Sequence, residues 1–293
     1  MKGTAITVAS CALLVAWGAL SPETFNFGFD AIDWVFGWMG GFWVTFLVSA
    51  SVGVCFLLAF PHVSAQAAIA SVKDRIKHNL LSIRIFQDDL PTVARGVAGS
   101  LGWNTVYLGL NLLPMVFLAG PFMYVWFQLD ALYAFDPLQP GDKRMVVAEL
   151  QEGVDSAAVE VSIPDFAVLG KRANLPGRVV LEVTASGPGL GEIEFRSGGE
   201  TVGKVLAVGE RPRRLARIRT SDPWGEFFKA RDPMIGFGEP VLHSASFVRS
   251  IWLEYPAAPL GPFGGGEIAI MLLFMVVSLL VGFGLKGVFG VEI

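Results

Sequence analysis

The sequence has few of the residues that hold disulfides or metal ions. Its 293 residues include two cysteines, Cys11 and Cys55, and both lie in apolar stretches where a thiol packs like a small apolar side chain. A disulfide framework and a CxxC redox site are therefore excluded for the polar part of the chain. The three histidines have no second histidine or carboxylate at metal-ligand spacing, so we expect no metal site. They are His62, His78 and His243.

Charged residues are also scarce. They make up 16% of the chain, hydrophobic residues make up 53%, and the mean hydropathy is +0.56. This composition is typical of an integral membrane protein rather than a soluble domain. Four stretches are nearly free of charge over the length that a spanning helix needs, and we expect four transmembrane helices from them. They are residues 4–20, 41–60, 101–129 and 268–285.

The first stretch has two interpretations. A lysine followed by an apolar run and small residues is typical of a cleavable signal peptide, and equally of a retained signal anchor. We expect retention, which makes residues 1–62 a unit of two spans joined by an acidic loop.

The loops differ in charge sign, which predicts an orientation. Residues 21–41 contain acidic residues and no Lys or Arg, whereas the next loop contains five basic residues. Basic residues in short loops stay on the cytoplasmic side. We therefore expect both termini in the cytoplasm and residues 130–266 outside, in a bacterial cytoplasmic (inner) membrane. Trp34, Trp38 and Trp43 fit an aromatic belt at the outer interface.

The basic loop has helical periodicity. Apolar residues recur at spacings of three and four between residues 69 and 83, and Lys73, Lys77 and Arg84 lie along one flank. We expect a cytoplasmic amphipathic helical hairpin over residues 63–102, followed by a third transmembrane helix at 103–130. Its basic flank is either a lipid-headgroup contact or a docking site for another protein.

Residues 142–260 change character. Seven short runs with β-branched or alternating residues are separated by Gly, Pro, Asn and Asp, which predicts an extracytoplasmic β-sandwich. A fourth transmembrane helix follows at 267–288. The fold class is thus an α-helical membrane bundle with an inserted β-sandwich.

A basic run in this domain contains Arg211, Arg213 and Arg214. These side chains are either partner or lipid contacts or the charges of a solvated edge strand that blocks edge-to-edge pairing. The domain as a whole has 15 basic and 16 acidic residues, so nucleic acid is not an expected ligand. No nucleophile–base pair, phosphate loop or informative carboxylate pair is present. We expect no enzyme and no cofactor.

The third stretch contains an unusual stripe. At 100° per residue, its polar residues and both prolines fall on one side of a helix. Each proline removes a donor and crowds a carbonyl four residues back, and an unsatisfied carbonyl is costly in hydrocarbon. The stripe should therefore face other helices or a hydrated groove. With two hydroxyls of the second stretch, the predicted groove comprises Thr45, Ser49, Asn104, Tyr107, Asn111, Pro114 and Gln128.

The same stretch carries a family resemblance. NLLPM at 111–115 and FDPL at 135–138, with the order of a span, a basic hairpin, a proline-containing span and a final span, resemble the Oxa/YidC insertase superfamily. The branch most similar is that of the third subunit of the endoplasmic reticulum membrane complex and its archaeal relatives. The chain differs from that branch in its β-sandwich, its additional first span and the lack of Lys or Arg within the spans.

The resemblance implies an insertase-like protein that assists the insertion or assembly of other membrane proteins. The alternative is a non-catalytic docking subunit of a larger envelope complex, with the β-sandwich as its interaction module. The expected partners are the lipid bilayer and other membrane proteins, either clients or subunits.

Overall fold

The computed structural model describes residues 2–229, 231 and 234–290, and the chain divides into two compact units. The first unit comprises Met1–Ser21, Phe46–Tyr124 and Phe274–Ile293. The second comprises Pro22–Thr45 and Val125–Leu273. Three long helices, α3, α5 and α7, contribute to both units.

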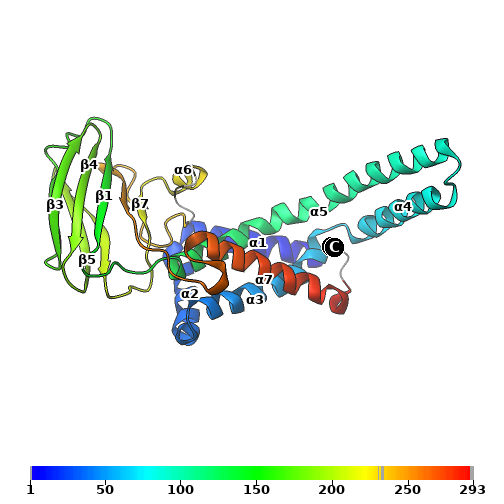
Figure 1. Cartoon of the computed structure of the whole chain (residues 1–293), viewed down its shortest axis with the longest axis horizontal. Helices are drawn as coiled ribbons and strands as arrows, with labels where there is room; N and C mark the ends of the chain where they lie inside the picture. Colours follow the sequence, from blue (N-terminus) through cyan, green and yellow to red (C-terminus); the bar gives the residue numbers. More distant parts are fainter. Residues whose placement is uncertain (1, 230, 232–233, 291–293) are drawn as a thin grey trace. The chain divides into compact units, whose positions relative to one another are not determined.

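The first unit is helical (Figure 1). Its elements are α1 (Lys2–Leu20), most of α3 (Gly41–Val63), α4 (Gln66–Ile85), most of α5 (Leu90–Tyr133) and the larger part of α7 (Gly266–Phe289). α3, α5 and α7 are long and apolar enough to cross a membrane, and a fourth span results if the bent pair of α1 and the following helix counts as one. The apolar stretches therefore form helices as predicted, and the structure leaves the number of spans at three or four.

α4 and the first half of α5 form an antiparallel hairpin (Figure 1). Gly96 and Gly99 of α5 lie against Asn79 of α4, where an added Cβ would come within 3.1 Å and 2.7 Å of Asn79 atoms. These glycines allow the two helices to approach closely. The predicted hairpin is present, but α5 is one continuous helix through Pro114 and Pro121. The predicted boundary at residue 103 is therefore not a break between helices.

α3 and α7 pack closely within the same unit. A Cβ added at Gly53 of α3 would lie 2.5 Å from the backbone oxygen of Ser278 in α7. Small residues at such crossings let helix backbones approach in a membrane. This contact fixes one wall of the helical bundle.

The second unit contains two antiparallel sheets. A five-stranded sheet has the order β3-β4-β1-β8-β7, and a three-stranded sheet has the order β2-β5-β6. The strands are β1 (Lys143–Leu150), β2 (Glu160–Ser162), β3 (Ala167–Leu175), β4 (Arg178–Ala185), β5 (Gly189–Ser197), β6 (Glu200–Val208), β7 (Ile218–Thr220) and β8 (Val248–Leu253). Buried and partly exposed residues alternate along β1 and β4, which gives each strand one inward face. This arrangement fits the predicted β-sandwich.

The strands differ from the sequence pattern at two places. The alternating runs predict seven strands and none at Ala167–Leu175, yet this polar, almost wholly exposed segment forms edge strand β3, and the turn after it is Pro176-Gly177, with Gly177 at φ +73°. The run at 214–219 has the pattern of a strand, but β7 begins only at Ile218 and the preceding arginines lie in a loop.

Helices complete the second unit. The predicted acidic loop at 21–41 is not a loop, because α2 (Pro22–Phe36) and the 3-10 turn η1 (Gly37–Met39) occupy it. Pro22 opens α2 and Glu23 lies in its first turn, both favourable at a helix N-terminus. α6 (Pro223–Phe228) lies between β7 and β8 in the chain, and η2 (Gly261–Phe263) precedes α7.

Candidate functional site

None of the seven predicted groove residues lines the apolar cavity that α3, α5 and α7 form in the first unit. Ser49, Asn104, Tyr107, Asn111 and Pro114 belong to the first unit, whereas Thr45 and Gln128 belong to the second. Thr45, Ser49 and Gln128 are fully buried, as expected for polar groups in an apolar helix. Asn104 is exposed, and its predicted place in a hydrated groove stays a prediction.

Asn111 is the predicted groove residue whose role is clearest. It is buried, and its Nδ2 donates a hydrogen bond of 2.8 Å to the Tyr107 carbonyl one turn back. Its amide therefore serves the backbone of the proline-containing helix, a common way to satisfy polar groups in hydrocarbon. Pro114 is buried on the same side.

An apolar cavity of about 200 Å³ lies between α3, α5 and α7 in the first unit. Its lining is apolar apart from Ser278, whose Oγ donates to the Met275 carbonyl within α7. Met115 and Phe283 are both lining and partly exposed, so the cavity reaches the surface of the bundle. The lining residues are Phe56, Met115, Leu118, Ala119, Phe122, Ser278, Leu279, Gly282 and Phe283. Such a site fits apolar groups.

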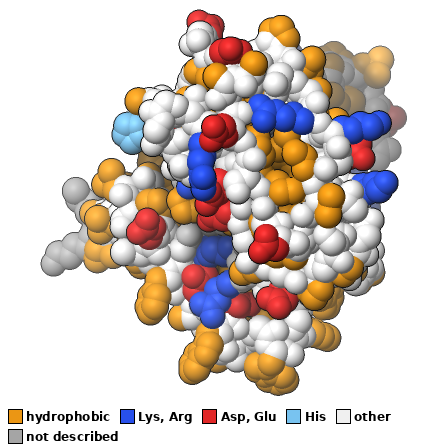
Figure 2. All heavy atoms as spheres, turned by 90° about the vertical axis from the view of Figure 1, so that its left-hand side faces the viewer, with side chains coloured by type: hydrophobic (Ala, Val, Ile, Leu, Met, Phe, Trp, Pro, Cys, Tyr) orange, Lys and Arg blue, Asp and Glu red, His pale blue; other side chains and the backbone are white. Residues whose placement is uncertain are grey.

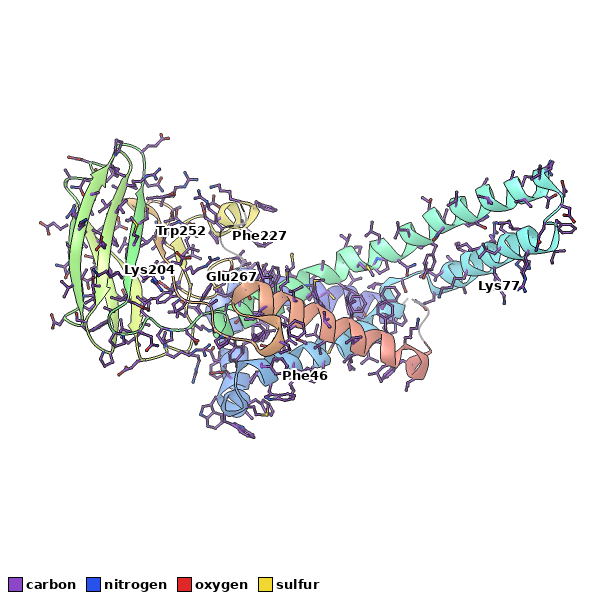
Figure 3. All side chains as sticks on the ribbon, in the orientation of Figure 1. Phe46, Lys77, Lys204, Phe227, Trp252 and Glu267 are labelled. Carbon is purple, nitrogen blue, oxygen red and sulfur yellow. The ribbon has the colours of Figure 1, made fainter. Side chains whose placement is uncertain are left out.

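The basic flank of the hairpin is only partly free. The Lys73 ammonium lies 5.8 Å from the centre of the Tyr107 ring, and Arg75 lies 4.3 Å from that of Trp103. Lys77 and Arg84 are exposed; Figure 3 labels Lys77 on α4. Large apolar side chains are exposed toward the end of the hairpin. They are Leu80, Leu81, Ile85, Phe86 and Leu90.

The three predicted contact arginines of the second unit bind residues of their own unit. Arg214 donates to Asp30 of α2 and to the Asn26 and Phe237 carbonyls. Arg213 lies 3.7 Å from Asp33, and Arg211 donates to the Leu132 carbonyl. Burial lowers the pKa of the Arg214 guanidinium, and its hydrogen bond to Asp30 opposes that effect.

Arg213 and Arg214 therefore form an arginine clamp on α2, whereas Arg211 binds the end of α5. Neither predicted role, partner contact or solvated edge strand, includes it. The sequence contains an acidic segment at 21–41 and a basic run at 211–219, but no local pattern indicates that the two segments contact each other.

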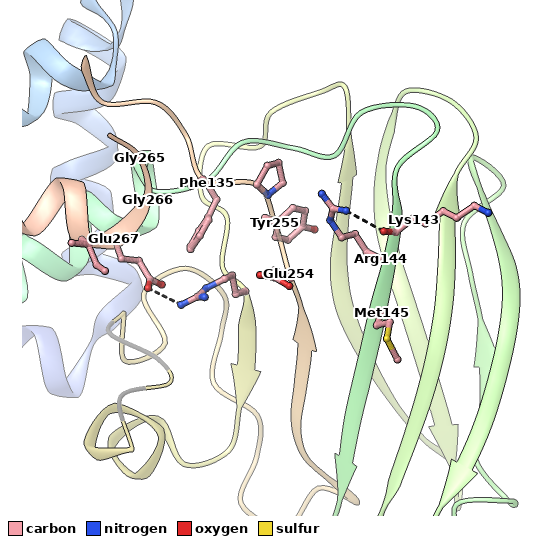
Figure 4. A pocket seen from close by; sticks show the side chains of 13 residues that line it. Phe135, Lys143, Arg144, Met145, Glu254, Tyr255, Gly265, Gly266 and Glu267 are labelled. Carbon is pink, nitrogen blue, oxygen red and sulfur yellow. Dashed lines mark hydrogen bonds and ion pairs between the residues drawn. The ribbon is translucent and has the colours of Figure 1, made fainter. Parts of the chain in front are cut away.

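A polar cleft of about 700 Å³ lies in the second unit (Figure 4). Arg217 crosses it and donates a 2.6 Å hydrogen bond to Glu267 at the start of α7. Lys143, Arg144 and Glu254 also line it, together with Phe135 and Tyr255. None of its lining residues is a Ser, Cys or His.

A buried ion pair of the β-sandwich was missed by the sequence analysis. The Lys204 ammonium is paired with Glu239 and donates to the Ala216 carbonyl, and both side chains are almost fully buried. Figure 3 labels Lys204 in the β domain. The available signal was a single lysine within the apolar strand at 200–208. Because a buried ion without its partner is strongly destabilising, this pair limits how the interior of the β-sandwich can pack.

Charges of both signs are interspersed with apolar side chains on the face drawn in Figure 2. Within the described ranges, no three His, Cys, Asp or Glu side chains form a group that could hold a metal ion. No family model, no curated protein and no solved structure matches the chain. Three helices have the length and composition of membrane spans, and two antiparallel sheets form a β domain.

Proposed function

We propose that the chain is a non-catalytic membrane protein that assists the insertion or assembly of other membrane proteins. Three helices with the length and composition of membrane spans support the setting. The basic loop and the acidic segment before α3 support an orientation with both termini in the cytoplasm and the β domain outside. A bacterial inner membrane is the proposed location.

The apolar cavity between α3, α5 and α7 is the observation that carries the proposal. It reaches the bundle surface at the level of hydrocarbon, where the available partners are acyl chains and apolar helices. A side chain of a client helix fits such a notch, because close packing drives helix association in lipid. The proposed activity is thus to hold an apolar client span.

The hairpin of α4 and α5 is the proposed first contact. Its exposed apolar end and the exposed Lys77 and Arg84 combine features that suit an apolar segment with an acidic flank. The cavity is lined by apolar residues and holds no cation, so the geometry supports packing against a client rather than attraction of its charges.

Filling the cavity tests this proposal. Ala119→Phe places a ring in the cavity, whereas Gly109→Phe adds the same ring on α5 where nothing lies within 4 Å. In a strain depleted of the wild-type protein, Ala119→Phe should reduce client membrane-protein levels and Gly109→Phe should not. Equal client levels with both variants, at equal amounts of the variants themselves, would count against the proposal.

Crosslinking locates the client directly. A photoreactive residue at Met115 or Leu279, both in the cavity wall, should crosslink a newly made membrane protein more strongly than one at the exposed Leu108 outside it. Similar yields from all three positions would contradict a specific site.

A second function is favoured by strand β3. It is an edge strand exposed along nearly its whole length, with Val168 and Leu175 half exposed. Such an edge can pair with another chain, which fits a docking subunit of an envelope complex. Purification in mild detergent should then yield a stoichiometric partner that Val168→Lys releases, and recovery as a lone monomer in several detergents would contradict this function.

A further inference from the structure

Large aromatic side chains are exposed on α2, on the 3-10 turn η1 that follows it and on α6, all in the second unit. Four of them leave 75–82% of their surface uncovered: Phe27, Trp34, Trp38 and Phe228. Trp224 is 42% exposed. Surfaces in water rarely expose so many large aromatic rings, so the surroundings of these helices need an explanation.

α2 has two different faces. Asn26, Asp30 and Asp33, spaced four and three apart, form one face, which binds Gln128, Arg214 and Tyr133. Phe27 and Trp34, seven apart, lie about 100° away and are exposed. The polar groups of α2 thus bind protein, while its aromatic groups point away from it.

α6 shows the same inversion. Its carboxylate Glu226 is buried and forms ion pairs with Lys229 and Arg231. Trp224 and Phe228 are exposed on the other side. A short helix in water would be expected to expose the carboxylate and cover the rings.

Both helices contact α5 at the same depth. Phe227 of α6 packs edge-on against Phe127, with ring centres 5.4 Å apart, and Asn26 of α2 accepts a 2.7 Å hydrogen bond from Gln128. These neighbouring positions lie six and five residues before the end of α5 at Tyr133. At 1.5 Å per residue they are about 8–9 Å from that end.

This depth corresponds to the membrane interface. The polar regions of a bilayer add about 5–8 Å on each side of a hydrocarbon core of about 30 Å. The apolar run of α5 ends at Leu129, immediately after both contacts. Trp is enriched at this level, and Trp and Phe are typical of the apolar face of helices that lie in the interface.

We propose that Phe27, Trp34, Trp38, Trp224 and Phe228 form an aromatic collar that lies in the outer headgroup layer of the bilayer. The collar seats the β domain on the membrane by two interfacial helices, α2 from the amino-terminal segment and α6 from the β domain itself. The arginine clamp turns the polar face of α2 toward the protein and leaves the aromatic face for lipid. This inference rests on the proposed membrane placement, and not on the assembly activity.

Spin labels on the full chain in lipid nanodiscs test the collar. In a Cys11→Ala, Cys55→Ala background, single cysteines replace Trp34 and Phe228 in the collar and Val168 in β3, all exposed. Leu280→Cys on α7 reports the span. Collisions with oxygen, which concentrates in lipid, are compared with those of a water-soluble nickel chelate.

The collar labels should favour oxygen over nickel several-fold more than the Val168 label. Equal ratios at positions 34, 228 and 168 would overturn the collar, and so would labels at 34 and 228 shielded from both reagents, because a protein would then cover them. A Leu280 label with the ratio of the Val168 label would show that the membrane placement fails. The two failures are therefore distinguishable.

Discussion

Arg214 and Asp30 are 184 residues apart and form a hydrogen-bonded ion pair, with Nε and Nη2 lying 2.8 Å and 2.7 Å from Oδ1. Arg214 is 11% exposed and Asp30 is 23% exposed. The pair joins α2 to the loop before β7 and is the central bond of the arginine clamp.

Asp30→Asn should weaken the attachment of α2. The guanidinium would remain buried without its anion, and hydrogen bonds to charged groups contribute about 1.5–3 kcal/mol each. We expect a lower unfolding temperature in detergent and faster proteolysis within residues 22–36.

Arg213→Ala is the matched control, because its contact with Asp33 is 3.7 Å long and half of the Arg213 side chain is exposed. Such pairs contribute about 0–1 kcal/mol. Equal effects of the two substitutions would argue against a clamp centred on Arg214.

The ion pair of Lys204 and Glu239 should show strong coupling. Lys204→Met alone leaves a buried carboxylate without its cation, which typically costs about 3–5 kcal/mol. The double variant Lys204→Met, Glu239→Gln removes both charges and should recover a large part of that loss. Thermal unfolding of the four proteins gives the coupling free energy, and additive effects would show that the two residues act independently.

Because Tyr255 is buried, the stability of the protein should fall as the pH rises in the alkaline range. Its hydroxyl donates to the Val205 carbonyl and accepts from the Ala207 amide. Burial, followed by the negative charge of Glu239, raises the pKa of Tyr255 above its ordinary value. The unfolded state therefore loses the phenol proton first as the pH rises.

The contribution of Tyr255 is fully present below about pH 10, the ordinary pKa of tyrosine, and declines above it by up to about 1.4 kcal/mol per pH unit. Tyr255→Phe should be less stable near neutral pH because the hydroxyl bonds are lost, and the difference from the wild type should narrow above pH 10. Chemical unfolding at several pH values measures this difference, and a constant gap would contradict it.

Gly53 should be intolerant of any side chain. Gly53→Ala places a Cβ 2.5 Å from the Ser278 backbone oxygen, so α3 and α7 must separate. We expect a clear loss of thermal stability in detergent. Gly109→Ala, on α5 with nothing within 4 Å, should be neutral or slightly stabilising because alanine favours a helix by about 1 kcal/mol. Equal stability of both variants would contradict the close crossing.

Local patterns predicted much of the fold. The long charge-free stretches form helices as predicted, because the length and hydropathy of an apolar run can be read from neighbouring residues alone. The alternating runs of β1, β4, β5 and β6 became strands for the same reason. β3 failed because an edge strand with both faces exposed has no alternation to detect. α2 failed because its acidic residues resemble those of a solvated loop.

A membrane-compatible composition, the hairpin and the presence of a β domain could be predicted from the sequence, because hydropathy and periodicity are properties of neighbouring residues. The interaction partners of individual side chains became known only from the folded structure. In the fold, Asn111 is buried and Asn104 is exposed on the same helix, and Arg214 forms an ion pair with Asp30. The cavity between α3, α5 and α7 is lined almost entirely by apolar side chains. Those outcomes depend on the approach of segments far apart in the chain, which no local pattern specifies.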